Sequence, residues 1–289
     1  MTTQGNEKTL TDEQFRALVQ LLDDEDPEVS RHVWAELNAM GRAVVPRLEA
    51  EWELLSDPDL QSVVESTIHR LQVQGTTADL LAWKDSGGKD LLLGWYLATR
   101  FQFPDLDFKG SSDQVKRLVN KIWLEMTPGM SPQDQIRAVN HILFRLEGFS
   151  PNTARPHHPQ NSFLNYVVEQ QQGNVMSITM LYLVICQHLD LPVYGVLLPG
   201  YFVLLYRDGN DEFYIDAING GKTFDRSRLE SYLKQVGVEP KPDYFNPATN
   251  LSILLRLVHL MAADYVRSEK PDKAEEVRDL LREIDPRLQ

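Results

Sequence analysis

The chain has 289 residues, of which 42% are hydrophobic and 25% are charged, so it contains enough apolar material for one large domain or for two to three small ones. Its formal net charge of −13 argues against nucleic acid or an anionic membrane as a partner, because both are bound by basic surfaces. The polar start lacks the apolar stretch of a secretory signal, and the longest apolar run, residues 180–186, is too short to span a membrane. The single cysteine, Cys186, cannot form an internal disulfide, so we expect a cytoplasmic protein.

The first part of the chain, residues 8–75, has helical periodicity throughout. Apolar residues such as Phe15, Leu18 and Leu22 recur at helical spacing, and two Asp-Pro pairs have the form of an N-cap followed by proline at the first helical position. The stretch 26-DPEVSRHVWAELNAMGRAVVPRL-48 resembles a HEAT-type helical repeat. We therefore predict that residues 1–75 form a HEAT-like helical segment, a kind of structure that commonly binds proteins.

Helical patterns continue through the middle of the chain. They cover 89–102, 113–126 and 132–149, and the Pro- and His-rich loop 150–160 leads into another helix at Asn161. The helix expected from about Val175 to Leu189 is apolar nearly all round, which is typical of a helix at the centre of a fold.

The periodicity then changes to that of strands. Three strands are expected at 193–198, 201–207 and 212–217, with a hairpin turn at 208-DGN-210. Helices first and then a small antiparallel sheet packed on a central helix predict a mainly helical α+β fold. Our predicted parts are a HEAT-like segment, a helical lead-in with the core, and a closing helix pair, over residues 1–75, 76–245 and 246–289.

Four short motifs in the middle of the chain are similar to those of a known family. They are 161-NSFLN-165, 173-GNVMSITML-181, 198-LPGYF-202 and 215-IDAINGG-221. In this order they resemble the transglutaminase-like superfamily, and more closely its bacterial SirB-type branch, which typically shows N-S-x-L-N, G-I-P-I-S-L, L-P-G-H-F and I-D-P-x-x-G-G. The resemblance implies a papain-like core over residues 130–225, and residues 246–286 resemble the tetratricopeptide-like helix pair that often ends this branch.

The resemblance also implies where a catalytic site would lie. In catalytic members a cysteine at the N-terminus of the central helix works with a strand histidine and an aspartate on the next strand. These positions fall on Val175, Tyr201 and Asp216, so only the aspartate is retained. Val175 has no heteroatom, and a tyrosine with an ordinary pKa of about 10 is a poor base at neutral pH, so the usual thiol chemistry is not expected.

Other groups could stand in for the missing ones, and each also has a structural interpretation. Ser177 could line the site, or it could be a hydroxyl that caps the first turn of the helix. Cys186 lies deep in the apolar helix, where a cysteine behaves as a small hydrophobe. His157 and His158 are weak candidates for a metal site, because adjacent histidines seldom converge on one ion, and a solvated loop is the simpler interpretation.

Asp216 could also be retained for structural reasons. Its carboxylate could cap the backbone of the following 219-NGG-221 turn, and it could form a hydrogen bond with Tyr201.

These observations leave several hypotheses open. The first is a catalytically degenerate transglutaminase-like protein that binds a protein or peptide and needs no cofactor. The second is a hydrolase or acyltransferase with a noncanonical site of Ser177, Tyr201 and Asp216, which requires the three side chains within hydrogen-bond reach in an open cleft. The third is a protein that keeps the cleft in order to bind a small ligand.

Overall fold

The computed structural model describes residues 10–288, and the chain divides into two compact units, residues 1–79 and 80–289. The helices that begin in the first unit are α1 (Asp12–Gln20), η1 (Leu21–Asp23), α2 (Pro27–Met40), η2 (Gly41–Val44), α3 (Val45–Trp52) and α4 (Pro58–Asp85). Thr11 and Asp26 cap α1 and α2, and Phe15, Leu37 and Leu48 belong to one buried core. The boundary that we predicted at residue 75 falls inside α4, and Gly75 does not interrupt that helix.

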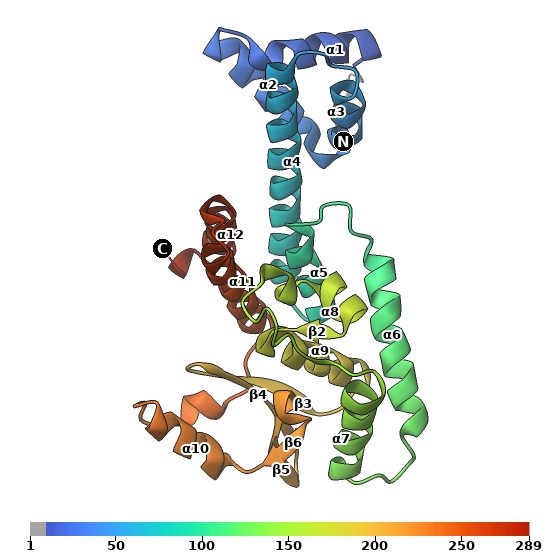
Figure 1. The fold of residues 1–289 in the computed structure, drawn as a ribbon, viewed down its shortest axis with the longest axis vertical. Helices are drawn as coiled ribbons and strands as arrows, with labels where there is room; N and C mark the ends of the chain where they lie inside the picture. The colour runs from blue at the N-terminus through green and yellow to red at the C-terminus, as the bar shows by residue number, and fades with distance from the viewer. Residues whose placement is uncertain (1–9, 289) are drawn as a thin grey trace, which may run out of the picture. The chain divides into compact units, whose positions relative to one another are not determined.

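The second unit contains the remaining helices and all the strands of the described residues (Figure 1). Its helices up to the sheet are α5 (Leu91–Arg100), α6 (Phe108–Glu125), α7 (Pro132–Asn140), η3 (His141–Leu146), η4 (Pro159–Ser162), α8 (Leu164–Gln170) and α9 (Val175–His188). The later helices are η5 (Ala217–Asn219), α10 (Arg226–Gln235), η6 (Pro242–Phe245), α11 (Asn250–Arg267), α12 (Pro271–Ile284) and η7 (Pro286–Leu288).

The strands form two separate sheets. They are β1 (Ser150–Pro151), β2 (Gln172–Gly173), β3 (Val193–Leu198), β4 (Tyr201–Asp208), β5 (Asp211–Asp216) and β6 (Lys222–Phe224). β1 and β2 form a short parallel pair, whereas β3, β4, β5 and β6 form an antiparallel sheet in chain order. The predicted α+β fold, mainly helical with a small antiparallel sheet, is therefore confirmed.

The antiparallel sheet has a different cover on each face. α9 contacts β3 and β4 as well as α6 and α8, so it lies at the centre of this unit (Figure 1). On the other face Leu229 and Leu233 of α10 join Val196 and Leu205 of the sheet in one buried cluster. This arrangement places the N-terminus of α9 near the start of β4.

Two elements depart from the expected bounds, and local capping explains the first of them. α6 begins at Phe108 rather than at residue 113, because the Asp107 carboxylate accepts hydrogen bonds from the backbone amides of Lys109 and Gly110. The helix expected over 132–149 ends its regular part at Asn140 and continues as the π-helical segment η3. Within residues 10–288, no helix has both the length and the apolar composition that crossing a bilayer requires.

Candidate functional site

The N-terminus of α9 is held by a reciprocal cap. The Asn174 side chain accepts a hydrogen bond from the Ser177 backbone amide at 2.8 Å, and the Ser177 hydroxyl accepts one from the Asn174 backbone amide at 2.9 Å. The same hydroxyl donates to the backbone oxygen of Asn161 at 2.6 Å. Ser177 is fully buried, so its oxygen acts as a first-turn capping group and is not open to a substrate.

A network of buried polar side chains supports this cap. The Asn174 amide group donates to the Ser162 hydroxyl at 2.8 Å, and the Asn152 amide group donates to the Asn161 side-chain oxygen at 3.0 Å. The Trp95 indole donates to the Ser162 backbone oxygen at 2.8 Å. Polar groups buried in this way must be paired, so the network fixes where α9 begins.

Sequence reasoning did not assign a role to Asn161 or Ser162. They are the first two residues of the N-S-x-L-N motif, and both are fully buried. The signal that could have found them is a polar pair directly before the apolar residues Phe163 and Leu164.

Val175 is the first residue of α9, and its side chain is open to solvent. It is 44% exposed and borders a hollow of about 350 Å³. The apolar part of the lining is formed by Met176, Phe202 and Leu260, with Gly200 beside them. No thiol or hydroxyl group is among the residues that line this hollow.

Two polar residues of α11 complete the rim of the hollow at Val175. Arg256 donates a hydrogen bond to the Leu198 backbone oxygen at 2.8 Å, and burial lowers the pKa of its guanidinium. The Nδ1 atom of His259 lies 2.8 Å from the Leu255 backbone oxygen, one turn back in the same helix. Sequence reasoning missed both residues, because a helix that begins 75 positions after Val175 gives no local sign that it reaches this hollow.

Asp216 and Tyr201 form the second part of the candidate site. The Tyr201 hydroxyl donates to the Asp216 carboxylate at 2.9 Å, and the Asn219 amide group donates to the same oxygen at 2.6 Å. The other carboxylate oxygen accepts from the Asn219 backbone amide at 3.3 Å, and Arg228 lies 3.7 Å from the carboxylate. The expected Tyr201–Asp216 hydrogen bond and the expected cap on the following turn are both present.

The surroundings of Tyr201 keep its hydroxyl protonated. Burial, the hydrogen bond to Asp216 and the charge of that carboxylate all raise the pKa of Tyr201. Its ring packs 5.1 Å from the ring of Tyr232, whose hydroxyl donates to the Pro199 backbone oxygen at 2.9 Å. A phenol that is already donating to a carboxylate and resists ionisation cannot act as a base near neutral pH.

The predicted site residues therefore lie in three separate places and do not form one site. Tyr201 and Asp216 are in one hydrogen-bonded network, whereas Ser177 belongs to the polar network under α9. The hollow at Val175 is lined by Gly200 and Phe202, the residues on either side of Tyr201 in the sequence, rather than by Tyr201 itself. Within residues 10–288, no hydrogen bond joins Ser177 to Tyr201 or to Asp216.

The remaining candidates lie elsewhere. Cys186 is fully buried in α9, and burial raises the pKa of its thiol, which makes it unreactive. His157 is largely exposed, and its Nδ1 atom lies 3.7 Å from the buried carboxylate of Asp264. Burial lowers the pKa of His158. In the part of the chain that the structure describes, no cluster of three or more His, Cys, Asp or Glu residues could hold a metal ion.

Comparison with known proteins adds a family and several relatives. The transglutaminase-like superfamily matches residues 110–259 of the chain. A UPF0162 protein of Xylella fastidiosa (strain Temecula1) is 27% identical over 212 residues, which cover 71% of this chain and 75% of the relative. The protein SirB1 of Salmonella typhimurium is 23% identical over 197 residues, covering 67% of this chain and 73% of the relative.

A further relative is the UPF0162 protein YchA of Escherichia coli (strain K12). It is 21% identical over 193 residues, which cover 65% of this chain and 70% of the relative. No solved structure matches the chain.

Proposed function

The chain belongs to the transglutaminase-like superfamily, in its SirB-type branch, and we propose that it uses this fold to bind a protein or peptide without catalysing a reaction. The observation that carries the proposal is the hollow at the N-terminus of α9, where the exposed side chain of Val175 stands in place of a nucleophile. A helix N-terminus stabilises a thiolate at this position, but a valine gives it nothing to activate.

The lining of the hollow suits a side chain of a bound peptide. Met176, Phe202 and Leu260 offer apolar surface, and Gly200 has no side chain to keep a peptide backbone away. The volume of about 350 Å³ accommodates a side chain such as leucine, whose complete burial contributes about 1.5–3 kcal/mol. Such a contact needs no proton transfer, so it is compatible with the loss of two of the three catalytic positions.

The hydrolase or acyltransferase alternative has less support. It requires a hydroxyl that can attack a substrate, but the Ser177 hydroxyl is fully buried and donates a hydrogen bond to the Asn161 backbone oxygen. It also requires a base, but Tyr201 is itself a donor to Asp216. We therefore retain the binding role as the proposal.

A photo-crosslinking experiment tests the binding role directly. A benzophenone amino acid is introduced at Val175, and the same residue at Val236 is the control, because the two valines have similar exposure, 44% and 47%. After irradiation in a native extract, we expect a discrete protein adduct at position 175 that is absent at position 236. Identical products at both positions, or none at position 175, would contradict the proposal.

A second experiment tests whether Val175 and Tyr201 occupy the positions of the cysteine and the histidine in catalytic members of the family. We expect the folded protein to be inert to iodoacetamide, because its one cysteine is buried. Val175→Cys should react, and adding Tyr201→His should raise the rate further by restoring an imidazole beside Asp216. A Val236→Cys variant gives the rate of an ordinary exposed thiol, and an unreactive thiol at position 175 would show that the positional match is wrong.

The flanking helices are part of the same proposal. Residues 1–75 resemble a HEAT-like segment and residues 246–289 a tetratricopeptide-like helix pair, and both kinds of structure commonly bind proteins. The acidic net charge of −13 supports partners other than nucleic acid or an anionic membrane, and the single cysteine supports a cytoplasmic location.

A further inference from the structure

A second hollow, of about 530 Å³, lies beside the turn that follows Asp216. The end of α7 and the π-helical segment η3 form one wall, and η5 with the start of β6 forms another. Its charged or titratable lining residues are Arg137, His141, Arg145 and Lys222. No carboxylate is among the lining residues, although the chain as a whole carries a net charge of −13.

Two of these cations have no protein partner. Within residues 10–288, the side chains of Arg145 and Lys222 form neither an ion pair nor a hydrogen bond, and both are exposed. Arg137 pairs with Asp134, and His141 lies 3.8 Å from a carboxylate oxygen of Glu125. The uncompensated charge of the hollow therefore comes from Arg145 and Lys222.

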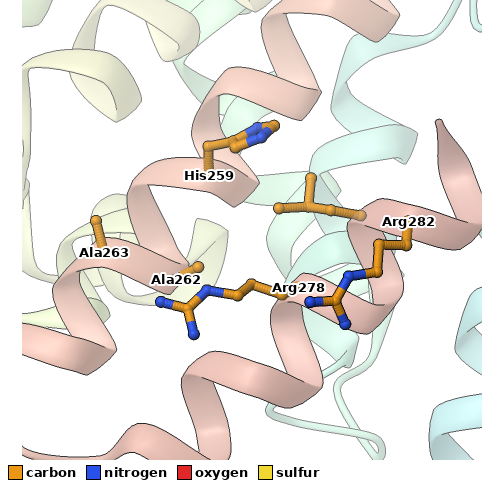
Figure 2. Close-up of a pocket in the computed structure, with 6 residues that line it drawn as sticks. His259, Ala262, Ala263, Arg278 and Arg282 are labelled. Carbon is orange, nitrogen blue, oxygen red and sulfur yellow. The ribbon is translucent and has the colours of Figure 1, made fainter. Parts of the chain in front are cut away.

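A third hollow shows that basic lining residues alone do not make an uncompensated positive charge. It lies between α11 and α12, where His259 and two alanines of α11 lie near Arg278 and Arg282 of α12 (Figure 2). Both guanidinium groups there are paired with Glu275, and Arg282 also pairs with Asp279. The charge at this place is already balanced within the protein.

Hydrogen bonds and a ring contact hold the walls around Arg145 and Lys222 together. The Asn140 side chain donates to the Gly221 backbone oxygen at 2.9 Å and accepts from the Tyr182 hydroxyl at 2.9 Å. The Phe144 ring stacks on the ring of Tyr182, with centroids 6.0 Å apart and planes inclined by 25°. Because these contacts already hold the walls, a ligand has to order only the exposed side chains of Arg145 and Lys222.

The π-helical turn also has a consequence for the lining. An inserted residue in a helix shifts the side chains that follow it around the helix axis, and such segments occur often at functional sites. Phe144 and Arg145 both lie in η3 and both line the hollow, so an aromatic surface and a cation come from adjacent positions.

We propose that this hollow binds the phosphoryl group of a small phosphorylated molecule, with Arg145 and Lys222 as its direct contacts. Two unpaired cations match the charge of a phosphate dianion, and an arginine can contact it through two N–H groups. The volume lies in the range of small-molecule sites and exceeds what inorganic phosphate alone would fill. Phe144 supplies a surface for the organic part of the ligand. This site is separate from the hollow at Val175 and does not depend on the binding role proposed there.

Calorimetric titration with phenyl phosphate at low ionic strength tests the site. The double variant R145Q/K222Q removes the two cations, and R31Q/K234Q is its control, because it removes one exposed arginine and one exposed lysine elsewhere and changes the net charge equally. We expect phenyl phosphate to bind the first variant at least about tenfold more weakly than wild type, and the control to match wild type. No binding to wild type, or equal loss in both variants, would overturn the proposal.

Two further titrations identify which part of the ligand is recognised. Inorganic phosphate lacks the ring that would lie against Phe144, and benzoate replaces the dianion with a single negative charge. We expect both to bind wild type more weakly than phenyl phosphate does. Benzoate binding as tightly as phenyl phosphate would show a general carboxylate or aromatic site and would contradict recognition of a phosphoryl group. All variants should unfold at the wild-type temperature, since the substituted side chains are exposed.

Discussion

The start of α9 and the end of β5 carry Val175 and Asp216, two positions that the family resemblance assigns to a catalytic set, and the surroundings of the two residues are opposite. Asp216 is 2% exposed, and its carboxylate accepts hydrogen bonds from Tyr201 and from the side chain and backbone of Asn219. Val175 is 44% exposed and has no polar side-chain atom. One position is enclosed by partners and the other faces an open hollow.

The difference shows that Asp216 has hydrogen-bond partners that the fold needs, whereas the side chain of Val175 has none. Asp216 has a structural task in this chain, because its carboxylate fixes the turn after β5 and the hydroxyl of Tyr201. The side chain at the first position of α9 has no comparable structural task, because Val175 is exposed and has no polar side-chain atom. The comparison can be tested by changing each part and measuring the free energy of unfolding.

The largest effect is expected for Asp216→Ala. Removing the carboxylate leaves the Tyr201 hydroxyl and the Asn219 amide group without their acceptor, so we expect a loss of about 3 kcal/mol in the free energy of unfolding. Urea unfolding measures this value. Asp105→Ala, in an exposed loop, is the control and should change stability by less than about 0.5 kcal/mol. A similarly small effect at Asp216 would refute its structural role.

The second-largest loss of stability is expected for Gly173→Ala, which tests the reciprocal cap of Asn174 and Ser177 at the start of α9. A Cβ atom at residue 173 would collide with the Ser177 hydroxyl and would lie 3.3 Å from the Asn161 backbone oxygen. Gly173→Ala should therefore lower the free energy of unfolding by about 2 kcal/mol, because the reciprocal cap of α9 must shift.

A matched glycine gives the control for this prediction. Gly110 is in the first turn of α6, and a Cβ atom there would meet only the Asp107 carboxylate, at 4.0 Å. Gly110→Ala should stabilise the protein by up to about 1 kcal/mol, since alanine favours a helix. Both variants can be compared by urea unfolding, and the same sign for both changes would contradict the packing described at Gly173.

Sequence patterns predicted the central helix and the longer strands of the second unit, residues 80–289, well. The bounds of α9, β3 and β4 agree with the expected ones to within one residue, because Gly, Pro, Asn and Asp residues punctuate these apolar runs. The short strand β6 and the π-helical segment η3 were not expected. β6 depends on pairing with β5, and η3 has no distinctive composition.

The candidate site was less predictable than the fold. The Tyr201–Asp216 hydrogen bond follows from two neighbouring strands and could be anticipated. The role of Asn161 could not, because it depends on a loop, a helix cap and the start of α9 meeting in space. Arg145 and Lys222 are 77 positions apart, and only the tertiary fold places both beside one hollow.

A smaller effect is expected for Tyr201→Phe. The ring can keep its packing against Tyr232, and only the hydrogen bond to Asp216 is lost, so stability should fall by about 1 kcal/mol. Tyr194→Phe is the control, because Tyr194 is 42% exposed, and it should leave the free energy of unfolding unchanged. A loss as large as that of Asp216→Ala would mean that Tyr201 is the main support of the network.

The pH dependence of stability gives a second test of Tyr201. Its pKa is raised in the folded protein, so above pH 10 the unfolded chain loses this proton first and the folded state is destabilised. Burial raises the pKa of Tyr206 and of Tyr265 to about 12, which acts in the same direction. Between pH 10 and 12 the free energy of unfolding should fall, and it should fall less steeply in Tyr201→Phe. Equal slopes would mean that the hydroxyl ionises as easily in the folded state as in the unfolded one.

The smallest effect is expected at Val175, where the Thr variant keeps the shape of the side chain and adds a hydroxyl. Because the side chain is 44% exposed, water can hydrate that hydroxyl, and the free energy of unfolding should change by less than about 0.5 kcal/mol. Val184→Thr in the same helix is the matched comparison, since Val184 is fully buried, and its hydroxyl should cost about 1–3 kcal/mol. If Val175→Thr were as costly as Val184→Thr, the hollow would be closed in solution and could not receive a peptide side chain. A neutral change at position 175 beside a costly one at position 184 would show that water reaches the side chain of residue 175 in the folded protein, which the proposed binding role requires.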